Sequence, residues 1–163
     1  MSILTIRAWW DVTISDLKIE DNSCLGEYYE DEVEGRSAGL TVTTIEGELS
    51  LSNIEISRNT CTWWVSSAFY AHVYDHDDIT LDGFKFSENV WSNSCSHGTM
   101  YFIASNGNSD EFIDTLEISN SSFVNNVAPL ASAIYSSASL WFQLDNVTIK
   151  GNRTTIGSRC AYV

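Results

Sequence analysis

The sequence predicts an all-β fold, a right-handed single-stranded parallel β-helix (solenoid) of about five rungs, where one rung is one turn of the coiled chain. Three observations predict it: an eleven-residue pattern that occurs five times, strands headed by small residues between the copies, and an asparagine closing each copy. The closing asparagines recur at intervals of 37, 30, 37 and 26 residues. Such intervals are typical of solenoids, in which a repeat buries its apolar face by stacking on its neighbours.

The repeated pattern is clearest in residues 49–59, which read Leu-Ser-Leu-Ser-Asn-Ile-Glu-Ile-Ser-Arg-Asn. Two apolar residues alternate with polar ones, a turn former follows, and a second alternating pair precedes the asparagine, which predicts two short strands joined by a bend. The other copies are residues 12–22, 79–89, 116–126 and 142–152. The turn formers of the five copies are Asp16, Asn53, Gly83, Asn120 and Asn146.

A second class of strands, headed by small residues, lies between the copies at residues 37–42, 67–70, 97–103 and 131–135. Small residues let the chain turn a tight corner. Because each of these strands precedes the next copy by a short bridge, we expect three strands in a rung and a three-sided coil. Parallel rungs stack about 4.8 Å apart, so equivalent residues should align in inner apolar columns. One column pair would contain Leu49/Leu51, Ile79/Leu81, Leu116/Ile118 and Phe142/Leu144, and another Ile54/Ile56, Phe84/Phe86, Phe123 and Val147/Ile149.

The closing asparagines are expected to form a ladder at one corner, because asparagine tolerates a left-handed backbone and its amide can hydrogen-bond to the next rung. This is a structural role and not a catalytic one. The ladder residues are Asn22, Asn59, Asn89, Asn126 and Asn152. On the outer face of the second strand, Lys18, Glu55 and Lys85 fall in consecutive rungs, so opposite charges should alternate there.

The composition and net charge of the chain argue against two classes of binding partner. The 163 residues are 44% hydrophobic, which predicts one folded domain over 1–163, and the formal net charge is −14. So acidic a chain disfavours binding to nucleic acid or to an anionic membrane surface. No apolar run approaches the roughly 20 residues of a membrane span, so we expect no membrane insertion of this segment. Both ends carry the same strand type without a cap, which favours continuation into further solenoid or head-to-tail self-association into a filament.

Cysteines and glycosylation signals favour a secreted or cell-surface protein. Cys24 and Cys61 both follow a closing asparagine by two residues, so we expect a disulfide between them. The pairing of Cys95 and Cys160 stays open. N-glycosylation signals begin at Asn120, Asn146 and Asn152, of which the first two lie in the outward turn column and the third in the ladder.

Two groups of residues are candidates for metal binding, catalysis or ligand binding. Asp75, Asp77 and Asp78 are weak candidates for a calcium site, or for acid–base work in a carbohydrate-active enzyme; a solvated loop is the alternative. Apart from calcium no cofactor is expected. Trp9-Trp10, Trp63-Trp64 and Trp91 could form a platform for sugar rings or a partner, but we favour interior or loop-covering positions. On a strand at most one residue of each pair would face solvent.

The pattern endings resemble a known repeat. Ile-Glu-Asp-Asn at 19–22 and Phe-Ser-Glu-Asn at 86–89, with the strands headed by Ser-Ala-Gly-Leu and Ala-Ser-Ala-Ile, resemble the Phe-x-x-Asn and Gly-Gly-Ala-Ile repeats of polymorphic outer-membrane-protein passengers. The wider resemblance is to the pectin-lyase-like β-helix superfamily. The catalytic Asp, Arg, Lys or Gly-His-Gly motifs of its pectate-lyase and polygalacturonase members are not found here, so no catalytic residue is carried over.

Two functions follow as hypotheses. The first is a non-enzymatic extracellular structural or adhesive solenoid, a segment of a large surface protein or the subunit of a filament, with a glycan or cell-surface ligand as a further partner. The second is a carbohydrate-active β-helix enzyme, a polysaccharide lyase or hydrolase. Five rungs favour the first hypothesis, because enzymes of that superfamily need more rungs and protruding loops.

Overall fold

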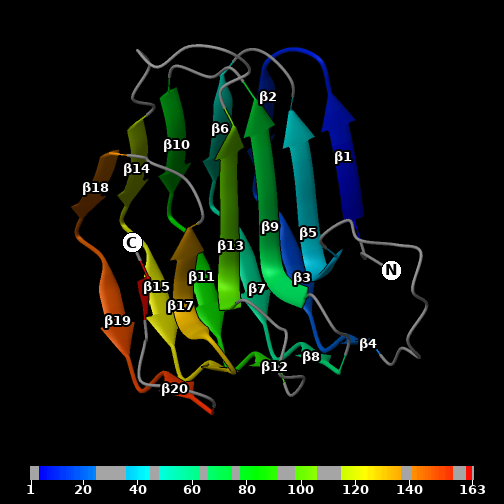
Figure 1. Ribbon diagram of the computed structural model, residues 1–163, viewed down its shortest axis with the longest axis vertical. Helices are drawn as coiled ribbons and strands as arrows, with labels where there is room; N and C mark the ends of the chain where they lie inside the picture. The colour runs from blue at the N-terminus through cyan, green and yellow to red at the C-terminus, as the bar shows by residue number, and fades with distance from the viewer. Residues whose placement is uncertain are drawn as a thin grey trace.

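The computed structural model is a coil of short parallel strands, with its N-terminal rung at the right and its C-terminal rung at the left of Figure 1. The structure describes residues 4–24, 36–44, 48–62, 66–74, 78–91, 98–105, 115–136, 141–155 and 161–162. Within these residues every regular element is a β-strand, and all strand pairs are parallel. Among the same residues, no helix is long and apolar enough to span a membrane. The predicted parallel β-helix is therefore confirmed.

Four parallel sheets form the sides of the coil, and each rung contributes one strand to each sheet. Sheet A contains β1 (Leu4–Ala8), β5 (Arg36–Thr44), β9 (Ser66–Tyr74), β13 (Gly98–Ser105), β17 (Ala131–Ser136) and β21 (Ala161–Tyr162). Sheet B contains β2 (Val12–Ser15), β6 (Leu49–Ser52), β10 (Asp78–Asp82), β14 (Thr115–Ser119) and β18 (Trp141–Asp145). Sheet C contains β3 (Lys18–Glu20), β7 (Glu55–Ser57), β11 (Lys85–Ser87), β15 (Ser122–Val124) and β19 (Thr148–Lys150). Sheet D contains β4 (Ser23–Cys24), β8 (Thr60–Cys61), β12 (Val90–Trp91), β16 (Val127–Ala128) and β20 (Arg153–Thr154).

The three-sided coil expected from the sequence is wrong, because sheet D adds a fourth strand to each rung. Its strands are two residues long and follow the closing asparagine directly. Two residues cannot display an alternating pattern, so periodicity does not reveal this sheet. The other three sheets correspond to the small-headed strand and to the two halves of the repeated pattern.

The register along sheets B and C matches the predicted apolar columns. In sheet B, Val12, Leu49, Ile79, Leu116 and Phe142 pair in sequence. In sheet C, the inner column is Ile19, Ile56, Phe86, Phe123 and Ile149, and the outer one begins Lys18, Glu55, Lys85. The Lys18 Nζ atom lies 3.9 Å from Glu55 Oε1, so the charges on the outer face do alternate at this step.

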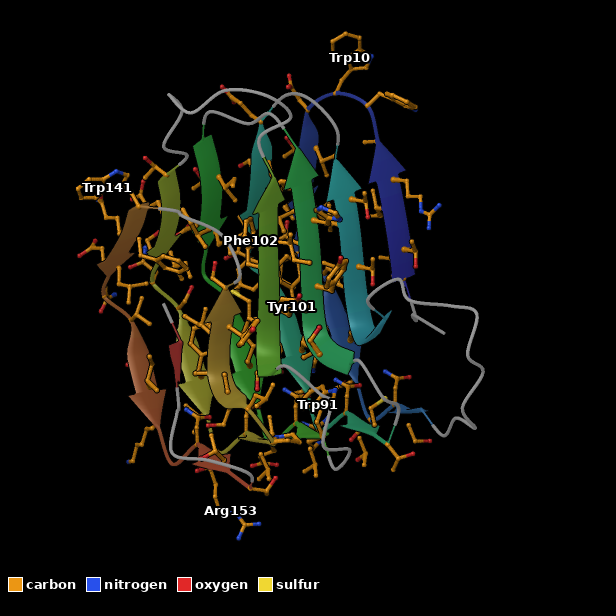
Figure 2. The ribbon with its side chains drawn as sticks, in the orientation of Figure 1. Trp10, Trp91, Tyr101, Phe102, Trp141 and Arg153 are labelled. Carbon is orange, nitrogen blue, oxygen red and sulfur yellow. The ribbon has the colours of Figure 1, made fainter. Side chains whose placement is uncertain are left out.

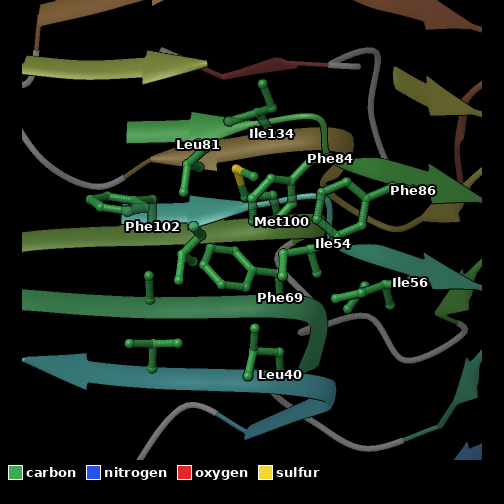
Figure 3. Packing of buried hydrophobic residues seen from close by; sticks show 14 of the residues in the cluster. Leu40, Ile54, Ile56, Phe69, Leu81, Phe84, Phe86, Met100, Phe102 and Ile134 are labelled. Carbon is green, nitrogen blue, oxygen red and sulfur yellow. The ribbon is translucent and has the colours of Figure 1, made fainter. Parts of the chain in front are cut away.

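Aromatic rings pack among aliphatic side chains in the centre of the coil (Figure 3). Phe84 stacks on Phe86 with ring centroids 5.4 Å apart, and Phe86 stacks on Phe123 at 5.1 Å. Phe69, from sheet A, packs edge to face on Phe84 at 5.5 Å. Stacked and edge-to-face pairs are both favoured geometries for aromatic rings. The contacts tie sheet A to the corner between sheets B and C, so neighbouring rungs share one core.

Two left-handed corners bend every rung. The turn formers between sheets B and C all have positive φ, and so do the residues just before the ladder asparagines. The first set is Asp16, Asn53, Gly83, Asn120 and Asn146, and the second is Asp21, Arg58, Glu88, Asn125 and Gly151. The expectation that the ladder asparagines themselves are left-handed is therefore wrong by one residue. The left-handed position is held by aspartate, arginine, glutamate, asparagine and glycine in the five rungs, so no single residue type marks it.

Two glycines near the heads of sheet A strands, Gly39 and Gly98, have no room for a Cβ atom. A Cβ atom on Gly39 would collide with the carbonyl oxygen of Ala68, and one on Gly98 would collide with that of Ala131. The small residues that were expected to let the chain turn a tight corner therefore allow a close approach between neighbouring rungs at these two glycines. The register of sheet A shifts at the same places, between Gly98 and Met100 and between Ser37 and Leu40.

The stretch from sheet B through sheet D has one length in all five rungs. It runs over residues 12–24, 49–61, 79–91, 116–128 and 142–154. All variation in rung length therefore lies in the remainder of the rung, which carries the sheet A strand and the connections on either side of it. We call this invariant stretch the constant segment.

Candidate functional site

The asparagine ladder is the most regular polar feature of the coil. Asn89 donates from both its backbone N and its Nδ2 to Oδ1 of Asn126, each at 3.0 Å. Its Nδ2 also donates to the carbonyl of Ile56 in the preceding rung at 2.8 Å. Asn59, Asn89 and Asn126 are fully buried. A buried amide group is stable only when its polar atoms form hydrogen bonds. Each of these three side chains therefore links its own rung to the rung on either side.

The ladder has a direction. Every step runs the same way, from the N–H groups of one asparagine to the Oδ1 atom of the next asparagine along the chain. The steps are Asn22 to Asn59 at 3.0 Å, Asn59 to Asn89 at 3.1 Å, Asn89 to Asn126 at 3.0 Å and Asn126 to Asn152 at 3.0 Å, measured from Nδ2 to Oδ1. At the N-terminal end, Oδ1 of Asn22 accepts no hydrogen bond within the described residues. The ladder therefore ends there on an open acceptor.

Beside the ladder, one arginine joins the first two rungs. The Arg58 guanidinium donates from Nε and Nη2 to the two carboxylate oxygens of Asp21, each at 2.7 Å, and Nη2 also reaches Glu20. These bonds to Arg58 are the main reason that the pKa values of Asp21 and Glu20 lie below their ordinary ones, and they raise the pKa of Arg58. Arg58 itself lies in the left-handed region, with φ 53°.

The turn column between sheets B and C carries a second set of bonds between rungs. Oδ1 of Asp82 accepts from Oγ of Ser119 at 2.7 Å and from Nδ2 of Asn120 at 2.8 Å, and both bonds lower the pKa of Asp82. Nδ2 of Asn146 donates to Oδ1 of Asn120 at 2.8 Å. Recurring polar residues at both corners thus bind the neighbouring rung.

The end rungs differ from the interior ones. Within the column of sheet B, Leu51, Leu81 and Ile118 are fully buried, whereas Leu144 is 49% exposed. In sheet C, Ile149 is 42% exposed, and Trp141 at the start of β18 is 65% exposed. Figure 2 shows Trp141 projecting from the C-terminal rung. Leu144 and Ile149 continue the inner apolar columns of sheets B and C, whereas Trp141 lies on the opposite face of β18 from Phe142.

The tryptophans divide into buried and exposed ones. Trp91 is fully buried in sheet D, as expected. Trp9 and Trp10 are 69% and 71% exposed, and Trp10 projects away from the ribbon in Figure 2. The expectation that at most one of this pair faces solvent is wrong, because both lie in a bend between β1 and β2 and the alternation of a strand does not apply. Trp63 and Trp64 lie outside the described residues.

The three glycosylation signals occupy different surroundings. Asn120 and Asn146 are exposed, left-handed and one rung apart in the turn column. Asn152 is half-buried in the ladder, where its Nδ2 donates to the carbonyl of Phe123 at 2.7 Å. Attachment of a glycan is therefore sterically easier at Asn120 and Asn146 than at Asn152.

Two of the four cysteines are register partners in sheet D. Cys24 and Cys61 are paired residues of adjacent strands. Parallel strands lie about 4.8 Å apart, which is within the Cα separation of a disulfide. Cys61 is buried and disulfide-bonded. Cys95 and Cys160 lie outside the described residues, and their pairing stays open.

The acidic candidates for calcium cannot be placed together. Asp75 and Asp77 lie outside the described residues, and of Asp78 only the backbone is described, as the first residue of β10. Within the described part of the chain, no cluster of His, Cys, Asp and Glu side chains has the geometry to hold a metal ion. Calcium binding stays a prediction.

Comparison of the chain with protein-family models, with curated proteins and with solved structures finds no match.

Proposed function

We propose that this chain is a non-enzymatic extracellular structural or adhesive β-solenoid, either a segment of a large surface protein or the subunit of a filament. The observation that supports the proposal most is that recurring polar residues form hydrogen bonds between neighbouring rungs. The ladder asparagines, Arg58 and Asp82 each bond to a neighbouring rung. A chain whose repeated polar groups hold adjacent rungs in register is suited to forming a stiff rod.

An adhesive role is supported by exposed aromatic side chains. Trp9 and Trp10 lie side by side in one bend and are both largely exposed. Large exposed apolar side chains often mark contact sites, and an indole ring offers an apolar face together with one N–H donor. The bend is therefore the region of the described chain where we place contact with a glycan or a cell-surface ligand.

A secreted or cell-surface location is supported by the turn column and by sheet D. Asn120 and Asn146 present two glycosylation signals on exposed corners, and Cys24 pairs with Cys61 in the register of sheet D. We propose glycans at these two asparagines and a Cys24–Cys61 disulfide. The native protein should lose mass on treatment with an N-glycosidase, and it should show no free thiol at either cysteine before reduction. An unchanged mass together with two free thiols would contradict secretion.

The non-enzymatic part of the proposal is tested by incubation with polygalacturonate and with other acidic glycans. We expect neither new reducing ends nor unsaturated products. Release of either product by the purified chain, lost on Asp75→Asn, Asp77→Asn or Asp78→Asn substitution, would instead establish the carbohydrate-active enzyme.

A further inference from the structure

A column of tyrosines runs along the outer face of sheet A. Tyr70, Tyr101 and Tyr135 are register partners on β9, β13 and β17, and Figure 2 marks Tyr101 on the middle strand. The residues that immediately precede them in the chain belong to the buried core: Phe69, Met100 and Ile134. Because side chains alternate across a strand, the three tyrosines lie on the opposite, outer face. We call them the tyrosine column.

Neighbouring rings of the tyrosine column are in contact. The ring centroids of Tyr70 and Tyr101 lie 5.4 Å apart, and those of Tyr101 and Tyr135 lie 5.2 Å apart. Both pairs are edge to face, with interplanar angles of 63° and 70°. In this geometry the rim of one ring approaches the face of the next. The carbons beside the phenolic oxygen belong to that rim, so rotation of the side chains is enough to bring two of them together.

We propose that the tyrosine column is a site of oxidative cross-linking, in which Tyr101 couples to Tyr135, and to a smaller extent to Tyr70, as dityrosine. The oxidant is hydrogen peroxide acting through a haem peroxidase. Each of two tyrosines gives up one electron and its phenolic proton. The two phenoxyl radicals then form a bond between ring carbons adjacent to the oxygen-bearing carbon, and the hydrogen on each of these carbons moves to the oxygen. Peroxide accepts the two electrons and two protons and leaves as two water molecules, so the chain loses two hydrogen atoms.

Exposure favours the pair of Tyr101 and Tyr135. Both residues are half-buried, whereas Tyr70 is only 7% exposed. A radical forms where the oxidant, or a small phenol that carries the radical to the chain, reaches the ring. A half-exposed ring also has room to rotate toward its neighbour. Tyr70 is therefore expected to couple less than Tyr135 does.

The fold supplies the proximity that coupling needs. Neighbouring strands of a sheet lie about 4.8 Å apart, so the register holds each tyrosine beside the next one in the column. Groups held in this way react as if they were present at a very high local concentration. A radical on Tyr101 therefore meets a partner within its own chain before it meets one in another molecule.

The cross-link would reinforce a part of the coil that lies apart from the polar corners. The asparagine ladder and the turn column join rungs within the constant segment, whereas the tyrosine column lies on sheet A, beside the connections whose length varies. A bond between β13 and β17 would close residues 101–135 into a loop and would reduce the entropy of the unfolded chain. This inference goes beyond the structural role proposed above and does not depend on it.

The first experiment treats the dilute full chain with hydrogen peroxide and a haem peroxidase and isolates the product that remains monomeric. After reduction, cleavage before aspartate places Tyr101 in the peptide 82–109 and Tyr135 in the peptide 114–144. Mass spectrometry should find these two peptides joined, with the sum of their masses reduced by two hydrogen atoms, and the product should show dityrosine fluorescence. The same treatment of the chain unfolded in urea should not give this pair preferentially.

The second experiment uses phenylalanine, which keeps the ring but has no phenolic hydrogen. Tyr101→Phe should abolish both cross-links, because it removes the residue that the two pairs share. Tyr135→Phe should abolish the first cross-link and increase coupling of Tyr70 to Tyr101. The matched control is the double variant Tyr28→Phe, Tyr29→Phe, which removes two phenols outside the described residues and should leave the joined peptides unchanged. Circular dichroism and the unfolding midpoint before oxidation show whether each variant is folded.

Oxidation should also raise the urea midpoint of the original chain and leave that of Tyr101→Phe unchanged. The proposal is overturned if the oxidised monomer lacks the joined peptides, if they form equally in the unfolded chain, or if dityrosine occurs only in covalent dimers. Equal urea midpoints of the oxidised and untreated chains would overturn the reinforcing role. Each of these outcomes leaves the structural role in place, since that role is contradicted by glycan cleavage, which does not involve the tyrosine column.

Discussion

The interior rungs and the C-terminal rung carry the same residue pattern but differ in burial. Leu81 and Leu144 hold equivalent positions in sheet B, yet the first is fully buried and the second is 49% exposed. The same contrast separates Phe123 from Ile149 in sheet C. The difference teaches that a single rung contains only part of a core, and that the neighbour on each side completes it.

The largest expected effect compares one leucine in the two settings. Leu81→Ala should lower the free energy of unfolding by about 3 kcal/mol, because it leaves a cavity between two rungs. Leu144→Ala should lower it by about 1 kcal/mol, since about half of that side chain is already in water. Urea unfolding of both variants measures the difference. Equal losses would show that the two positions are buried alike in solution.

Sequence patterns predict the columns and the ladder because these repeat residue types at fixed spacing. The five ladder asparagines and the residues of sheets B and C share chemistry from rung to rung, so alignment of the copies is enough to find them. Sheet D, with pairs as different as Thr60-Cys61 and Arg153-Thr154, has no shared type. The left-handed residue before the ladder escapes prediction for the same reason, since Arg58, Glu88 and Gly151 have nothing in common but φ.

Other parts of the candidate site depend on the local path of the chain rather than on residue type. Trp9 and Trp10 read as part of a strand, and only the bend between β1 and β2 exposes both. Likewise, residues 161–162 look like the start of another rung, but their pairing with β17 becomes known only from the register of sheet A.

The second prediction makes the same comparison along the ladder. Asn89→Ala removes the acceptor of the buried backbone N–H of Asn59, which would be left unbonded, and one of the three acceptors of Nδ2 of Asn59. We expect a loss of about 3 kcal/mol in the free energy of unfolding. Asn22→Ala removes no acceptor that is in use, so its loss should be about 1 kcal/mol. Chemical unfolding of the two variants measures both losses of free energy. A larger loss for Asn22→Ala than for Asn89→Ala would exclude the ladder geometry.

The third prediction concerns the left-handed corner, where Glu88 in an interior rung corresponds to Gly151 in the end rung. Glu88 has φ 57°, which is strained for a residue with a Cβ atom. Glu88→Gly should therefore raise the free energy of unfolding by about 0.5 kcal/mol, after the entropy cost of glycine is included. Glu55→Gly, in strand β7, is the matched control and should lower it by roughly the same amount. A loss in both variants would argue against strain at this corner.

The smallest expected effect is a loss of stability at acid pH in the first rung, where Arg58 forms ion pairs with Glu20 and Asp21. The pKa of each carboxylate is lowered in the folded chain, so their contribution is present above the unfolded pKa values. It is lost as the pH falls below the ordinary values of 4.5 for Glu20 and 3.8 for Asp21. Arg58→Ala should reduce the acid shift of the thermal midpoint at low salt, and added salt should diminish the difference. An identical pH profile for both proteins would show that the contact contributes nothing.

The constant segment, from sheet B through sheet D, has a consequence for how the chain can change in length. One residue inserted within it would invert the alternation beyond the insertion and would move apolar side chains of the column to the solvent face. The remainder of the rung already differs by up to 11 residues between copies, as the ladder separations of 37 and 26 residues record. Foreign peptides should therefore be accepted on that side of the coil and rejected on the other. The molecule would in this way serve as a display scaffold with one variable face and one fixed face.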